Sequence, residues 1–126
     1  MPDGPVRSIS TDSRSIPAGA CFFALRGERF DGHAFVETAL QAGACCAVVR
    51  DEVPAPPDGR IIRVADTLRA LGDLARWYRR RMEFRVVGIT GSAGKTTTRQ
   101  IVHHVLSQRM GCHQAEKSFN NAVGLP

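Results

Sequence analysis

The sequence predicts an α/β fold with a mostly parallel or mixed sheet. Apolar stretches of strand length alternate with longer segments whose apolar residues recur every three or four positions. One apolar stretch, residues 84–90, leads into a glycine-rich loop and a second helical pattern, the local order of a phosphate-binding unit. We therefore expect a small N-terminal domain with a mixed sheet at residues 1–83. Residues 84–126 are expected to begin a second, incomplete domain of the phosphate-loop type.

Two strands joined by a polar loop open the predicted N-terminal domain. Residues 6–10 and the apolar residues 21–25 have the composition of strands. The loop between them contains Asp12, Ser13 and Arg14, which can contact a ligand or form a turn closed by the aspartate side chain. From the residues alone, the two interpretations are equally supported.

Helices and strands alternate through the rest of this domain. The predicted elements are a helix at residues 34–42, a strand at 45–50, a surface loop at 52–59, a strand at 60–64 and a helix at 67–82. Prolines exclude a helix or a central strand from the loop. Asp66 is placed to cap the last helix, whose apolar residues follow helical spacing.

The composition limits the classes of function. Hydrophobic residues make up 43% and charged residues 23% of the 126 residues, the mixture of a folded globular protein. No apolar run has the length of a membrane span and no secretory signal pattern is present, so the expected location is the cytoplasm. The net charge of +5 raises nucleic acid as a partner, but the dense basic run, residues 79–81, ends a predicted helix, where cations favour the helix dipole. We expect neither a nucleic-acid nor a membrane partner.

The cysteines and histidines show no metal-binding spacing, so no zinc site is predicted. Cys45 and Cys46 are adjacent in a predicted strand, and their thiols are therefore expected on opposite faces. Reduced and mostly buried thiols are the expectation for all four cysteines.

The stretch "VVGITGSAGKTTTRQIV" is the strongest functional motif. Gly91 and Gly94 let backbone amides approach phosphate oxygens, and the helix that follows adds the positive end of its dipole. Lys95 can reach the β- and γ-phosphates of a nucleotide, and the Thr96 hydroxyl can ligate Mg²⁺. The common pattern has glycine where this chain has Ile89, so the match is T-G-x-x-G-K-T-T. The residues predicted to bind a magnesium nucleotide are Gly91, Ser92, Ala93, Gly94, Lys95, Thr96 and Thr97.

Three motifs resemble those of the Mur ligase family. They are the phosphate loop, the segment "TDSRSIPAGACFFALRGERFDGHAFVETALQAGACCAVV" and the closing "SFNNAVGLP", and together they extend over residues 9–126 in the order of the family. The "GS-x-GKT" loop and the "NN-x-x-G-x-P" segment are typical of the member that joins D-alanyl-D-alanine to UDP-N-acetylmuramoyl-tripeptide. The sibling that adds the third amino acid shares "DSR" but more usually has "GTNGKT", and it stays an alternative.

The resemblance implies an ATP-dependent amide ligase of cytoplasmic peptidoglycan precursor synthesis, with ATP and Mg²⁺ as cofactors. In the family, ATP phosphorylates the peptide carboxylate, and the amine of D-alanyl-D-alanine attacks the acyl phosphate. Lys95 would be the catalytic residue, and Thr96 would hold Mg²⁺. The first domain would bind the UDP-muramoyl end of the substrate. The residues implied for substrate binding are Ser13, Arg14, Asp31, Gly32, His33, Asn120 and Asn121.

Several alternatives stay open beside the resemblance. For Asp31, Gly32 and His33 a tight turn with a helix cap is the stronger interpretation. For Asn120 and Asn121 the alternative to ligand contact is a polar turn. Family members are much longer than this chain, so the chain on its own is expected to lack ligase turnover and to need the remainder of the ligase as a partner. It would then be a non-catalytic fragment that binds a UDP-sugar peptide or a nucleotide. A small phosphate-loop kinase or GTPase is disfavoured, because neither D-x-x-G nor N-K-x-D follows the loop. The third residue of the peptide, diaminopimelate or lysine, is left open.

Overall fold

The computed structural model describes residues 5–27, 30–54 and 60–115. The chain divides into two compact units, residues 1–73 and 74–126, and each is described by itself. The division falls inside helix α2 (Thr67–Arg81). The domain boundary after residue 83 stays a prediction.

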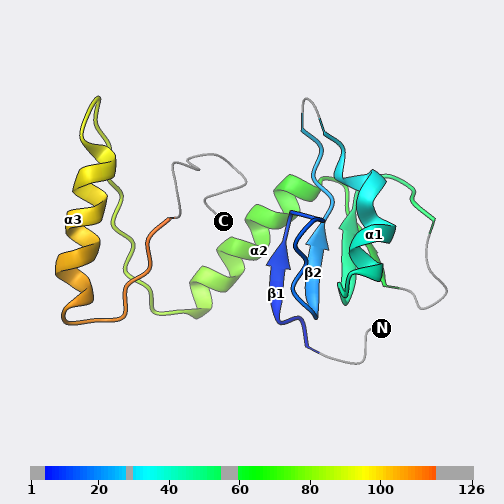
Figure 1. Cartoon of the computed structure of the whole chain (residues 1–126), viewed down its shortest axis with the longest axis horizontal. Helices are drawn as coiled ribbons and strands as arrows, with labels where there is room; N and C mark the ends of the chain where they lie inside the picture. Colours follow the sequence, from blue (N-terminus) through cyan, green and yellow to red (C-terminus); the bar gives the residue numbers. More distant parts are fainter. Residues whose placement is uncertain (1–4, 28–29, 55–59, 116–126) are drawn as a thin grey trace. The chain divides into compact units, whose positions relative to one another are not determined.

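A four-stranded parallel sheet forms the first unit, with the strands in the order β1-β2-β3-β4 (Figure 1). The strands are β1 (Ser8–Ser10), β2 (Ala20–Phe23), β3 (Cys46–Val49) and β4 (Ile61–Arg63). Each lies within or beside a segment that the sequence predicts as a strand. The α/β class is thus confirmed. The mixed sheet expected at residues 1–83 is not what the described strands form, because all three of their pairings are parallel.

One face of the sheet packs against a short helix. All residues of β2 and β3 are buried, as is typical of central strands in a parallel sheet covered on both faces. The 3₁₀ turn η1 (Gly32–Phe35) continues directly into α1 (Val36–Gln41), so the predicted helix begins two residues early. The buried side chains of this core come from β2, β3, α1 and the residues next to them: Phe22, Ala24, Val36, Ala39, Leu40, Ala44, Ala47 and Val49. Side-chain alternation places Cys21, Phe23, Cys46 and Val48 on the opposite face.

Helix α2 is fixed to the first unit at its N-terminal end. The Asp66 carboxylate accepts a hydrogen bond from the Arg69 backbone N–H at 2.9 Å, which confirms the predicted cap. The buried Thr67 hydroxyl donates to the Ala24 carbonyl oxygen at 3.0 Å, and Leu71 is buried. None of the helices in the described part of the chain combines the length and apolarity that crossing a bilayer requires.

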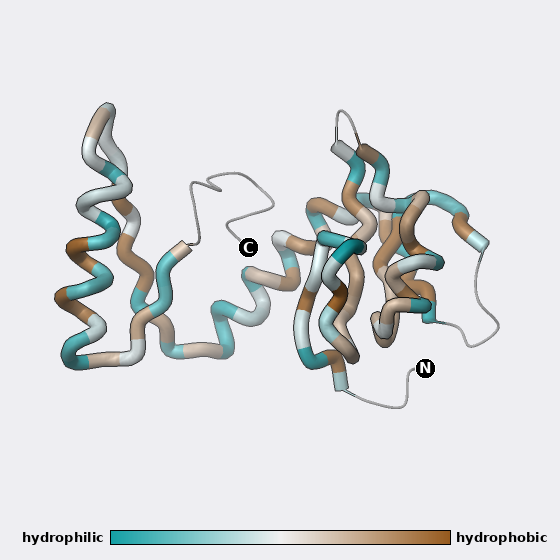
Figure 2. The backbone as a smooth tube through the Cα atoms, in the orientation of Figure 1, coloured by the Kyte–Doolittle hydropathy of each residue, from teal (hydrophilic) through white to brown (hydrophobic). Residues whose placement is uncertain are grey.

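Two sequence predictions are wrong. Cys45 lies in a bend before β3, and its Sγ atom is 3.8 Å from that of Cys46, so the two thiols lie together and not on opposite faces. Residues 84–90 of the second unit form no strand, because no described segment pairs with them. Val86 and Val87 in that segment are each 62% exposed. Brown stretches in Figure 2 mark apolar residues in the segment that precedes α3 (Lys95–Ser107).

Candidate functional site

The loop after β1 holds a local ion pair. Arg14 Nε and Nη2 donate to the two carboxylate oxygens of Asp12 at 2.9 and 2.7 Å, and the Arg14 backbone N–H donates to Asp12 Oδ1 at 3.0 Å. These hydrogen bonds lower the pKa of Asp12 to about 2 and raise that of Arg14. Ser13 between them is buried, whereas the side chain of Arg14 is 87% exposed. The predicted turn closed by the Asp12 carboxylate is therefore present, and the Arg14 guanidinium still faces solvent.

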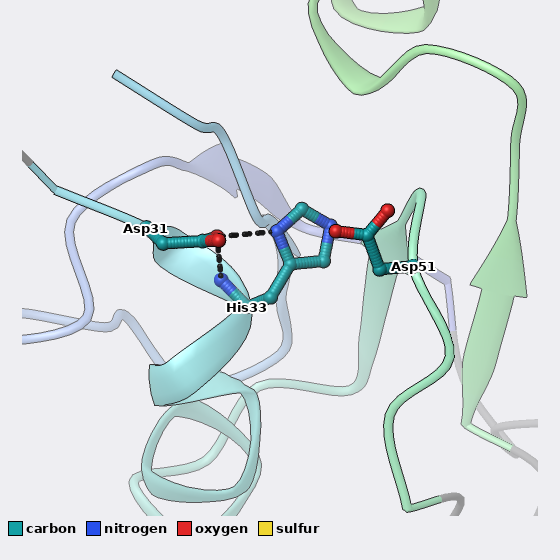
Figure 3. A group of neighbouring side chains, drawn as sticks. All are labelled: Asp31, His33 and Asp51. Carbon is teal, nitrogen blue, oxygen red and sulfur yellow. Dashed lines mark hydrogen bonds and ion pairs between the residues drawn. The ribbon is translucent and has the colours of Figure 1, made fainter. Parts of the chain in front are cut away.

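A second cluster forms around His33 at the start of η1 (Figure 3). Asp31 Oδ1 accepts hydrogen bonds from the His33 backbone N–H at 3.0 Å and lies 2.6 Å from His33 Nδ1. On the other side of the ring, Nε2 accepts from the Arg50 backbone N–H at 3.0 Å. Because Nε2 is an acceptor, the ring proton lies on Nδ1 and faces Asp31. The imidazole thus links the loop before α1 to the residue after β3.

Two arginines neutralise the carboxylates of this cluster. Arg26 Nη2 donates to Asp31 at 2.6 Å and to Asp51 at 2.8 Å, and Arg50 Nε donates to Asp51 at 2.8 Å. The pKa of Asp31 is held well below its usual range, first by the His33 backbone N–H and next by Arg26. Arg50 likewise lowers the pKa of Asp51. Sequence reasoning did not identify Arg26, Arg50 or Asp51, because they meet only through the fold and share no spacing.

Gly32 is required by a close approach of the backbone. Its N–H donates to the Leu25 carbonyl oxygen at 2.8 Å. A Cβ atom at this position would lie 2.8 Å from Leu25 N and 2.9 Å from Leu25 O, too close for any side chain. The predicted alternative for residues 31–33, a tight turn with a helix cap, is therefore present in the structure. Contact of these residues with a ligand stays a prediction.

The Asp31, His33 and Asp51 side chains each offer a ligand atom within 4.8 Å of the others. Both nitrogens of His33 are already engaged, and both carboxylates pair with guanidinium groups. A metal ion would have to displace two arginines. The donor set is therefore that of an ion-pair network and does not fit a metal site.

The phosphate loop precedes α3 in the second unit. Gly94, the N-cap residue, has φ 77°, a left-handed conformation that favours glycine. The N–H groups of the first helical turn have no intrahelical acceptor, and the hydrogen bonds of the helix begin with that from the Thr98 N–H to the Gly94 carbonyl oxygen at 2.9 Å. Lys95 Nζ donates to the Gly91 carbonyl oxygen at 2.6 Å, so the lysine folds back over the loop.

These residues fit a nucleotide phosphate and its Mg²⁺. Exposed backbone donors and the positive end of a long helix attract phosphate oxygens, and the Thr96 side chain is exposed at the same helix end. Ser92 and Ala93 form the bend between the two glycines, and Thr97 lies in the first turn. Asn120 and Asn121 lie outside the described residues.

Two regions of the chain match models of known domains. The "Mur ligase family, catalytic domain" matches residues 5–79, and the "Mur ligase middle domain" matches residues 89–126. Among relatives, the UDP-N-acetylmuramoyl-tripeptide–D-alanyl-D-alanine ligase of Bacillus subtilis (strain 168) is 43% identical over 122 residues, 96% of this chain and 27% of the relative.

Solved structures give the same result. A crystal structure of MurF from Acinetobacter baumannii has 36% sequence identity and a TM-score of 0.89, covering 98% of this chain and 27% of that chain. The MurF ligase from Thermotoga maritima, solved in complex with ADP, has 32% identity and a TM-score of 0.84 over 95% of this chain and 28% of that chain. This chain thus spans little more than a quarter of the length of the proteins it matches. The chain belongs to the Mur ligase family.

Proposed function

We propose that this chain supplies the UDP-muramoyl-binding unit and the phosphate loop of a ligase that joins D-alanyl-D-alanine to UDP-N-acetylmuramoyl-tripeptide. Relatives and solved neighbours with this named activity support the proposal. The observation in the structure that carries it is the loop before α3, where a left-handed Gly94, first-turn N–H groups without intrahelical acceptors and Lys95 converge. An ADP-bound neighbour supports a nucleotide as the ligand.

In this proposal the second unit binds ATP through residues 91–97. The first-turn N–H groups hold phosphate oxygens, and Lys95 exchanges its bond to the Gly91 carbonyl for one to the β- and γ-phosphates. Thr96 provides the hydroxyl that would hold Mg²⁺, which supplies charge neutralisation between the phosphates when bound. Lys95 then stabilises the charge on the phosphoryl group as it moves to the peptide carboxylate.

The first unit binds the UDP-muramoyl end of the substrate in this proposal. Arg14 can exchange its pairing with Asp12 for a diphosphate, because a guanidinium forks equally well onto either group. Asp31, Gly32 and His33 then present backbone and side-chain groups beside it. The residues proposed to bind this substrate, in the first unit and in the closing segment, are Ser13, Arg14, Asp31, Gly32, His33, Asn120 and Asn121.

The bond-forming step follows from the chemistry of the two substrates. Phosphoryl transfer from ATP to the terminal carboxylate of the tripeptide gives an acyl phosphate and ADP. The amine of D-alanyl-D-alanine attacks the acyl carbon, phosphate leaves, and an amide bond results. The sibling that adds the third amino acid shares the first step, so binding of the tripeptide substrate distinguishes the two. We propose the cytoplasm as the location.

Titration of the chain with MgATP and, separately, with UDP-N-acetylmuramoyl-tripeptide tests this proposal. We expect Thr96→Ala to weaken MgATP binding. Thr98 is also exposed and lies one residue beyond the proposed site, so Thr98→Ala should leave MgATP binding unchanged. Arg14→Ala is expected to weaken the sugar-nucleotide peptide and to leave MgATP binding unaffected. Equal effects of the two threonine variants, or binding of neither ligand, would contradict the proposal.

A further inference from the structure

Three cysteines gather at the N-terminal ends of β2 and β3. Cys21 in β2 lies opposite Cys46 in β3 in the register of the parallel pair, so their side chains leave the same face of the sheet. That face is the one opposite to the core packed against α1. The bend at Cys45 adds a third thiol, with its Sγ atom 3.8 Å from that of Cys46.

The spacing of the adjacent thiols suits a shared metal ion. Zinc and its relatives bind thiolate sulfur at about 2.3 Å, and two such sulfurs on a tetrahedral ion lie about 3.8 Å apart. The Cys45 and Cys46 sulfurs already have this separation.

The three thiols differ in their exposure to solvent. Cys46 and Cys21 are 3% and 4% exposed, whereas Cys45 is half-buried. Cys45 also lines an open hollow of about 240 Å³ together with Pro5, Arg7, Ala18 and Gly19. An ion can therefore enter from the hollow and meet Cys45 first, and solvent can fill a coordination position that the protein leaves open.

A divalent cation would neutralise the thiolates that bind it. A divalent cation bound by two thiolates makes a neutral group, and coordination deprotonates the thiols. The protons are released to the solvent.

We propose that Cys45 and Cys46 bind a thiophilic divalent metal ion of the zinc type. Cys21, which lies opposite Cys46 in the register of the two strands, becomes a third ligand after rotation of its side chain. The fourth position opens onto the hollow that Cys45 lines. Cysteine spacing does not indicate this site, because it depends on the bend at Cys45. With fewer than four protein ligands, the ion is expected to exchange readily.

Cadmium binding to the fully reduced chain tests the site. Cd²⁺ alone is added, and the sulfur-to-cadmium charge-transfer absorption is followed; we expect a single equivalent to saturate it and Zn²⁺ to displace it. Cys45→Ser should weaken binding by at least about 10-fold, because even loss of a group that only orients a ligand costs about 10- to 100-fold. Cys112→Ser is the matched control, since Cys112 is also half-buried, and it should bind as the unmodified chain does.

Alkylation of the unmodified chain gives a second test that requires no variant. Iodoacetamide labelling is followed cysteine by cysteine by mass spectrometry, with and without Cd²⁺. We expect the ion to slow labelling of Cys45 and to leave labelling of Cys112 unchanged. Equal protection of both cysteines, no protection of Cys45, or a charge-transfer band that persists in Cys45→Ser would overturn the proposal.

Discussion

At the scale of single residues, His33 holds the candidate substrate-binding loop. Its side chain is 7% exposed, and each ring nitrogen has a partner, Asp31 on one side and the Arg50 backbone N–H on the other. Arg26 then bridges Asp31 and Asp51, so both ends of the contact are fixed by ion pairs. The charged groups at the rim are exposed and contribute little each, whereas the buried imidazole satisfies a backbone donor.

Replacing His33 by alanine is expected to leave the Arg50 N–H without its acceptor. We predict a loss of about 0.5–3 kcal/mol in the free energy of unfolding, because the buried imidazole and its hydrogen bonds are removed, and faster hydrogen exchange at the Arg50 amide. Denaturant unfolding and amide exchange measure the two effects. His104→Ala on the exposed part of α3 is the control and should stay within about 0.5 kcal/mol. Unchanged hydrogen exchange at the Arg50 amide in His33→Ala would show that this amide does not donate to His33.

The ion pair between Asp12 and Arg14 predicts an acid titration. The pKa of Asp12 is about 2 in the folded chain against an ordinary value of 3.8. A lowered carboxyl pKa stabilises the fold above the ordinary value, and this contribution is lost as the pH falls through about 2. Carbon NMR of the carboxyl group should show a midpoint near 2, and Arg14→Ala should move it toward 3.8. Arg69→Ala, which alters a distant arginine, should leave the midpoint unchanged; an ordinary midpoint in the unmodified chain would rule out the ion pair.

At the scale of elements, the sequence predicts the helices and strands that are determined by their own residues. The apolar run of β2 and the capped, periodic helix α2 were predicted because strand composition and helical spacing determine them. Two other features depend on partners distant in sequence. Residues 84–90 have strand composition and find no neighbour among the described strands, and the bend at Cys45 reverses the side-chain alternation expected of a strand.

The close backbone approach at Gly32 predicts that alanine has opposite effects on stability at two glycine positions. Gly32→Ala places a methyl group against the Leu25 backbone, which side-chain motion cannot relieve, and we expect destabilisation by about 1–3 kcal/mol. Gly72→Ala is the matched control within α2, where nothing lies within 4 Å of the added Cβ atom. It should stabilise the chain by about 0.4–1 kcal/mol, because alanine favours the helix. Similar unfolding midpoints for the two variants would show that the close approach at Gly32 is absent.

At the scale of the whole molecule, the two units contribute different parts of the proposed reaction. The first unit has a buried core under its sheet, whereas the second exposes apolar residues along the segment before α3 and on α3 itself, including Val86, Val87 and Ile101. Sequence motifs identified the phosphate loop because its glycines and lysine are contiguous. The Arg26, Arg50 and Asp51 pairs were missed because the fold brings them together.

The chain on its own is predicted to carry out no ligation. It spans 27% of its Bacillus subtilis relative, and the proposed reaction requires sites for ATP and for two further substrates. Phosphate release should therefore not respond to D-alanyl-D-alanine when MgATP and UDP-N-acetylmuramoyl-tripeptide are present. A response that disappears in Lys95→Ala would show that the chain is sufficient for turnover.

The most direct measurement of the proposed function uses a chimera. This chain replaces the matching segment of the Bacillus subtilis relative, and phosphate release is measured with MgATP, UDP-N-acetylmuramoyl-tripeptide and D-alanyl-D-alanine. We predict release that requires D-alanyl-D-alanine and is abolished by Lys95→Ala, while Thr98→Ala retains it. A folded chimera that binds MgATP and the tripeptide substrate but releases no phosphate in response to D-alanyl-D-alanine would contradict the assignment of this chain to that ligase.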